Sequence, residues 1–107
     1  MEIRDLGWER FSAEHPDIAA QFCEAVKDFA ELARMGCGAS RAAASVLLYA
    51  FNKNDGIFEL YRLDGGRFVR AMVIIEISRY IEGDIVQTLM PYDVRSLKSL
   101  VSSDGEQ

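Results

Sequence analysis

Residues 57–90 decide the fold class of this chain, and they read IFELYRLDGGRFVRAMVIIEISRYIEGDIVQTLM. Their hydrophobic periodicity fits two regular structures equally well. A helix would bring together positions 69, 72, 73, 76, 77, 80 and 81, and a strand the alternate positions from 69 to 81. Six of the seven positions are apolar in each case. Periodicity therefore leaves helix and strand tied.

Composition and turn chemistry favour strands. Many of the apolar residues are β-branched, which suits a pleated sheet and handicaps a helix; they are Val69, Val73, Ile74, Ile75, Ile77 and Ile81. Asp64-Gly65-Gly66 and Glu82-Gly83-Asp84 flank the apolar run. Asp-Gly is a strong signal for the type I′ turn of a β-hairpin. We therefore predict a three-stranded antiparallel β-meander over residues 57–90.

Cross-strand pairing predicts the register of this meander. With a loop at Asp64-Gly65, Glu59 faces Arg70 and Tyr61 faces Phe68, and both are stabilising kinds of pair. Glu82-Gly83-Asp84 would form the second loop. One sheet face then collects apolar residues and should pack on the core. These are Phe58, Leu60, Val69, Ala71, Val73, Ile75, Ile77, Ile81, Ile85 and Leu89.

Helical patterns flank the meander. Pro16 suits the first position of a helix, which should extend to about Met35. This helix carries an apolar stripe at helical spacing, formed by Ile18, Phe22, Val26, Phe29 and Ala33. A second helix should begin after Ser40 as N-cap, run to about Lys53 and be largely buried. Asp93 should cap a last helix over residues 94–101. Residues 1–11 should form an irregular lead-in. The prediction is a single α+β domain, residues 1–101, with a disordered tail, residues 102–107.

Size and charge narrow the function classes. The chain has 107 residues and a formal net charge of -5, of which residues 1–35 carry -4. An acidic chain gains little from releasing counterions on a phosphate backbone, which disfavours a dedicated DNA binder. No apolar run approaches the length of about 20 residues that a membrane span needs. We expect a cytoplasmic protein. If Cys23 and Cys37 flank one helix that runs to about Met35, they should stand on the order of 20 Å apart, too far for a disulfide.

The second face of the predicted sheet is unusually apolar for a face exposed to water. Its aromatic and apolar members are Tyr61, Phe68, Met72, Ile74 and Tyr80, and Arg70 and Glu76 accompany them. Such a patch predicts partner binding or a homodimer. We therefore expect a small interaction module of the inhibitor, immunity-type, adaptor or regulatory-subunit kind. The alternative is that the last helix folds back and covers this face.

Two other sites remain open. Arg62, Arg67 and Arg70 lie near Tyr61 and Phe68, a combination that can bind nucleic acid through stacking and phosphate contacts. The turn Gly36-Cys37-Gly38, followed by Ser40 and Arg41, opens the second helix and can bind an anion or hold a reactive thiol. It lacks the preceding strand and the Gly-Lys-Ser/Thr ending of a P-loop.

Catalytic and metal chemistry find little support in the sequence. His15 is the only histidine, and it precedes Pro16, where a role at the helix start explains it. The two cysteines show no metal-ligand spacing. Glu76 interrupts the apolar run but has no evident carboxylate partner for acid–base work. We therefore predict no catalytic residue, no metal and no cofactor.

Overall fold

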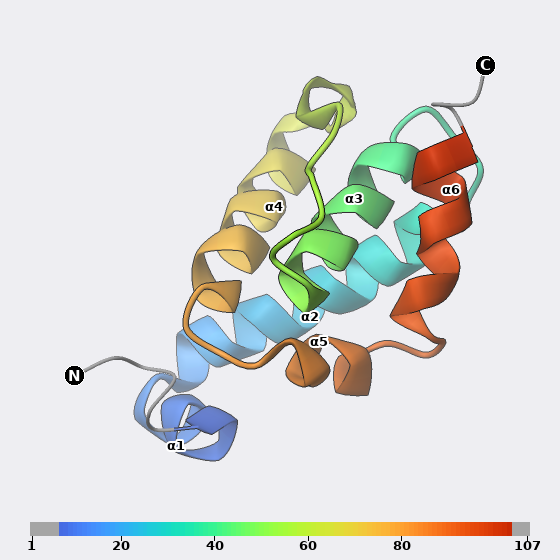
Figure 1. Cartoon of the computed structure of the whole chain (residues 1–107). Coiled ribbons are helices and arrows are strands. Elements are labelled where there is room, and N and C mark those ends of the chain that lie inside the picture. The colour runs from blue at the N-terminus through green and yellow to red at the C-terminus, as the bar shows by residue number, and fades with distance from the viewer. Residues whose placement is uncertain (1–6, 104–107) are drawn as a thin grey trace.

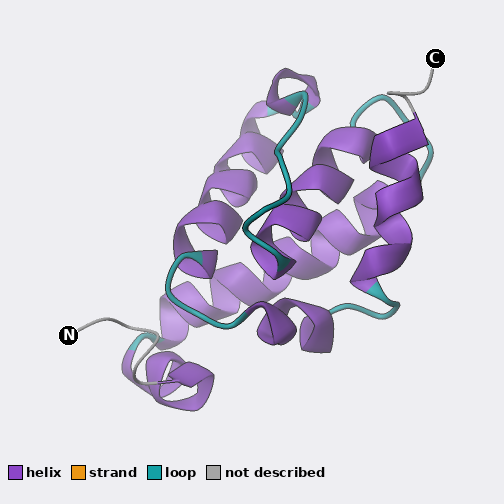
Figure 2. Cartoon of the chain, viewed as in Figure 1, coloured by secondary structure: helices purple, strands orange, loops and turns teal. Residues whose placement is uncertain are grey.

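A computed structural model of the chain describes residues 7–103, and side chains for residues 7–101. Every regular element in this part of the chain is helical (Figures 1 and 2). The elements are α1 (Gly7–Glu14), α2 (Pro16–Ala33), α3 (Ser40–Phe51), the 3₁₀ turn η2 (Leu60–Arg62), α4 (Gly65–Ser78), α5 (Gly83–Leu89), the 3₁₀ turn η3 (Val94–Leu97) and α6 (Lys98–Ser103). The predicted β-meander and the α+β class are therefore wrong.

Both sequences interpreted as hairpin turns begin helices instead. The Asp64 side chain accepts a hydrogen bond of 2.9 Å from the Arg67 backbone N–H, which caps α4. Glu82 occupies the corresponding position before α5. A type I′ turn needs positive φ at both central residues, but among the described glycines only Gly7 and Gly36 adopt it. The Asp-Gly signal was thus a helix start.

Helix α3 occupies the centre of the molecule. It packs against α2, α4, α5, η3 and α6, and Figure 1 shows it between α4 and α6. Nine of its twelve residues are buried, so the prediction of a largely buried second helix is confirmed. Ala42, Ala43 and Ala44 have no exposed surface. Their small side chains let neighbouring helices approach α3 closely.

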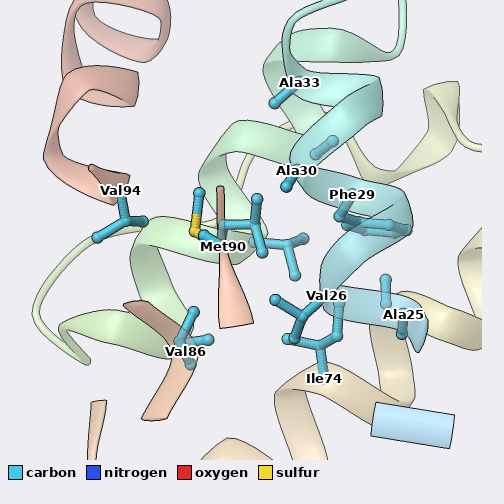
Figure 3. Close-up of a cluster of buried hydrophobic side chains, with 14 of the residues drawn as sticks. Ala25, Val26, Phe29, Ala30, Ala33, Ile74, Val86, Met90 and Val94 are labelled. Carbon is cyan, nitrogen blue, oxygen red and sulfur yellow. The ribbon is translucent and has the colours of Figure 1, made fainter. Parts of the chain in front are cut away.

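The apolar stripe of α2 forms one wall of the core, as predicted from Phe22 to Ala33. Phe22, Val26 and Phe29 are fully buried, whereas Ile18 at the start of the stripe is 42% exposed. Figure 3 shows Val26 and Phe29 beside Ile74 of α4, with Val86, Met90 and Val94 completing the cluster. Residues that were expected in strands therefore reach the core from helices.

Helix α4 buries a different face from either pattern proposed for it. Its buried residues are Ala71, Ile74, Ile77 and Ser78, which follow helical spacing. Val69 and Met72, which begin the helical stripe considered from the sequence, are exposed to solvent. Val69 was also assigned to the core face of the predicted sheet, and at 61% exposure it is not a core residue. Small Ala71 and Ser78 let α4 pack closely, while Phe68, Val69 and Met72 point outward.

Predictions made for the two ends of the chain are partly wrong and partly confirmed. Residues 7–11, expected to be irregular, belong to α1, and Trp8 packs its ring against Phe11 and Phe22. Asp93 caps η3 through a hydrogen bond from the Arg95 backbone N–H, as predicted. The predicted tail starts inside α6, and residues 104–107 lie outside the described part, as do residues 1–6. No described helix is both long and apolar enough to span a bilayer.

Candidate protein-interaction site

Large apolar side chains gather on the outside of α4 and on η2 just before it. We call this set the α4 face, and it comprises Tyr61, Phe68, Val69 and Met72, which are 79%, 41%, 61% and 39% exposed. Phe68 and Met72 are four residues apart and Val69 adjoins them, so all three project from one side of the helix. Contiguous apolar surface of this kind typically marks an interaction site.

The loop that carries Tyr61 is fixed by a carboxylate held between two arginines. Glu59 adopts φ 59°, an uncommon conformation for a residue other than glycine. Its carboxylate accepts a hydrogen bond of 2.9 Å from Arg41 and lies 3.2 Å from the Arg62 guanidinium. Arg41 also donates to the Val101 carbonyl. These contacts tie η2 to α3 and α6.

A second set of ion pairs joins the start of α4 to α2. Asp28 accepts two hydrogen bonds from Arg67, at 3.1 and 3.2 Å, and lies 3.2 Å from Arg70. Burial acts to raise the pKa of Asp28, but the hydrogen bonds and charges of Arg67 and Arg70 outweigh it and lower the pKa. Asp28 therefore stays ionised and holds the first turns of α4 in place.

The far end of α4 is polar. Glu76 pairs with Arg79 at 3.1 Å and accepts a hydrogen bond of 3.3 Å from the Tyr80 hydroxyl. The Glu76 and Arg79 side chains are both more than half exposed. The outer side of α4 thus changes from apolar near Phe68 to charged near Arg79.

The predicted partner-binding residues differ in how exposed they are to solvent. Tyr61, Phe68, Arg70, Met72 and Glu76 are exposed, as a binding surface requires. The other two are less accessible than predicted: Ile74 is fully buried and Tyr80 is half-buried. Sequence reasoning missed Val69, which the strand register had placed in the core. The helical spacing of positions 69, 72, 73 and 76 was the signal that could have found it.

The three arginines considered for nucleic acid each face a carboxylate. Arg62 pairs with Glu59, and both Arg67 and Arg70 pair with Asp28. Tyr61 and Phe68 do lie near them, with the Arg62 guanidinium 5.7 Å from the Tyr61 ring centroid. Binding phosphate there would compete with the existing ion pairs.

The glycine-rich turn between α2 and α3 forms a shallow hollow of about 300 Å³. The structure brings all of its predicted members together there, and adds residues that the sequence did not indicate: the full lining is Gly36, Cys37, Gly38, Ser40, Arg41, Glu59, Arg62 and Leu100. Ser40 is not the predicted N-cap. It is the first residue of α3, and its hydroxyl donates to the Leu32 carbonyl and accepts from the Cys37 N–H, which fastens the turn to the end of α2.

The two thiols have different environments. The Ser40 hydroxyl, 3.6 Å from Cys37 Sγ, and the Ala39 backbone N–H lower the pKa of the exposed Cys37. Burial raises the pKa of Cys23, and nearby Lys27 only partly offsets this. Both cysteines are free. Cys37 therefore carries the larger thiolate fraction at neutral pH.

We expect Cys37 to be alkylated faster than Cys23 in the folded protein. The thiolate is the reactive species, and Cys37 is both more exposed and more ionised. Timed iodoacetamide labelling at pH 7, read by peptide mass spectrometry, measures the two rates. Labelling in urea is the control, because unfolding should bring the rates together. Equal rates in the folded protein would contradict the assigned environments.

Comparisons with known proteins return no match to a family model, a curated protein or a solved structure. The described residues also contain no group of three or more histidine, cysteine or acidic side chains arranged to hold a metal ion.

Proposed function

We propose that this protein is a protein–protein interaction module that pairs with a second copy of itself through the α4 face. The supporting observation is the exposure of Phe68, Val69 and Met72 on one side of α4, together with exposed Tyr61 on η2 just before it. Aromatic residues and methionine are enriched in the buried centres of interfaces. Removing these side chains from water is the driving force for the association.

The dimensions of α4 suit helix-against-helix packing. Its 14 residues extend about 21 Å at ~1.5 Å per residue. Gly65 lies seven residues before Met72, on the same side of the helix, and has no side chain. No atom lies within 4 Å of the position that a Cβ on Gly65 would occupy. A second helix can therefore approach the backbone closely at this end.

Charges at the two ends of α4 favour an antiparallel pair. Asp64 is the N-cap and Arg79 the C-cap of this helix. In an antiparallel arrangement centred near Met72, Asp64 of each copy lies beside Arg79 of the other, while a parallel arrangement places like charges together. Like charges across an interface are costly, so the pairing selects one orientation.

We expect Met72→Glu to convert a concentration-dependent dimer into a monomer. A charge placed at the centre of the contact would lose its hydration, weakening association by about tenfold or more. Sedimentation equilibrium of both proteins over a range of concentrations measures this change. Ile18→Glu is the matched control, because Ile18 is similarly exposed but lies outside the α4 face. A wild-type protein that stays monomeric at every concentration would refute the proposal.

Cysteine cross-linking tests the orientation of the pair. In a background with Cys23 and Cys37 replaced by serine, Met72→Cys should form an intermolecular disulfide under oxidation. Phe68→Cys should not, because two copies of position 68 would lie about 12 Å apart along antiparallel helices. Efficient cross-linking of both variants indicates parallel pairing and contradicts the antiparallel arrangement.

A further inference from the structure

A groove runs between the C-terminal half of α2 and residues 89–92, on residues that the α4 face does not use. It encloses about 710 Å³, within the size range of small-molecule sites. Its walls are mainly apolar, formed by Ala30 and Met35 on one side and by Leu89 and Pro91 on the other. Lys27 and Arg34 contribute positive charge from α2.

Two polar side chains fix the wall opposite α2. The Tyr92 hydroxyl donates a hydrogen bond to the Ala30 carbonyl, in the last turn of α2. Gln87 donates to the Tyr92 carbonyl and accepts from the Val94 backbone N–H, both at 2.7 Å. Because Tyr92 and Gln87 hold the segment from both sides, the groove is formed before any ligand arrives.

Arg34 differs from the other described arginines. Seven of them lie within 4 Å of a carboxylate, namely Arg10, Arg41, Arg62, Arg67, Arg70, Arg79 and Arg95. Arg34 instead stacks its guanidinium 3.8 Å from the centroid of the Tyr92 ring. Stacking uses the face of the guanidinium and leaves its N–H edge available. That edge is the part that binds a carboxylate through two parallel hydrogen bonds.

We propose that this groove binds a small amphipathic carboxylate, with its head on Arg34 and its hydrocarbon body along Leu89 and Pro91. Lys27 lies seven residues before Arg34, about 10 Å along the helix, and adds positive potential over the groove. Glu31 stands between them, so a ligand with one negative charge fits better than a highly charged one. The predominance of apolar wall selects a ligand with a hydrocarbon or aromatic body.

Calorimetric titration with dodecanoate, below the concentration at which it forms micelles, tests this site. We expect saturable binding to the wild-type protein and none of dodecyltrimethylammonium, which has the same chain and the opposite charge. Arg34→Gln should weaken dodecanoate binding about tenfold through loss of a charge-assisted contact. Arg95→Gln, which removes an exposed arginine elsewhere, should leave the affinity unchanged.

A second variant tests the site independently, in case Arg34→Gln fails to fold. Met35 is 60% exposed on the groove wall, so Met35→Glu should preserve the helical circular dichroism and still repel the carboxylate. Met72→Glu should bind dodecanoate as the wild type does. The proposal is overturned if no binding occurs, if the cationic chain binds equally well, or if Met72→Glu abolishes binding while Arg34→Gln and Met35→Glu do not.

Discussion

Ile74→Ala should lower the free energy of unfolding by about 3 kcal/mol. Ile74 is fully buried in the cluster with Val26 and Phe29 (Figure 3), so truncation removes packed methylene groups and leaves a cavity. Urea denaturation followed by circular dichroism measures the change, provided that the slope with denaturant is unchanged. The protein should be kept dilute so that self-association does not contribute.

Val69→Ala is the matched control on the same helix. Val69 is 61% exposed, and alanine has the higher helix propensity, so its effect should stay within about 0.5 kcal/mol. A β-strand would reverse this order, because alternation would turn Val69 toward the core and Ile74 away from it. A costly Val69→Ala beside a neutral Ile74→Ala would therefore contradict the helical structure of α4.

Gly83→Ala should destabilise the protein by about 3 kcal/mol through a clash of backbone with side chain. A Cβ on Gly83 would lie 2.0 Å from the Phe51 carbonyl oxygen and 2.8 Å from its carbon. Both atoms belong to the backbone at the end of α3, so they cannot move aside as a flexible side chain could. Relief requires α5 to separate from α3, which the midpoint of thermal unfolding would report.

Gly66→Ala provides the comparison for this substitution. A Cβ at Gly66 would lie 3.6 Å from Asp64 Oδ1, an ordinary contact. Since alanine restricts the unfolded chain and favours a helix, Gly66→Ala should be neutral or stabilise by about 0.5 kcal/mol. Equal effects at both glycines would show that the close approach of α5 to α3 is not important for stability.

The helices on either side of the misread segment were predictable from local signals. Pro16 begins α2 as expected, and the largely buried character of α3 follows from its mostly apolar sequence. Asp93 caps η3 as the sequence indicates. At Pro16 and Asp93 a helix-starting or capping residue agrees with the hydrophobic pattern beside it, so local preference and packing point to the same structure.

Residues 57–90 were mispredicted because the deciding interactions are not local. The isoleucines and valines of α4 favour strand by composition, but packing of Ile74 and Ile77 on the bundle outweighs a propensity difference of less than about 1 kcal/mol per residue. Asp64 before Gly65 is compatible with both a hairpin turn and a helix cap. Neighbours from α2 and α3 select the helix.

The candidate sites show the same division. Tyr61, Phe68 and Met72 could be chosen from the sequence as unusual apolar residues, although the surface that carries them is a helix and not a sheet. The groove beside Arg34 was not predicted at all. It needs the hydroxyl of Tyr92 to reach the carbonyl of Ala30, 62 residues earlier in the chain, and no local pattern indicates that contact.

The amino-acid sequence by itself determined which segments are apolar and that α2 and α3 are helices, but it did not indicate α1 or the helix starts after Asp64 and Glu82. Only the tertiary structure decided that residues 65–78 form an α-helix and which side of that helix is buried. It alone also placed the Arg34 guanidinium over the Tyr92 ring. The physical reason is that caps and glycines act within a few residues, whereas burial depends on which surfaces come together. Small Ala71 and Ser78 fit against neighbouring helices, and the larger Phe68 and Met72 are left outside.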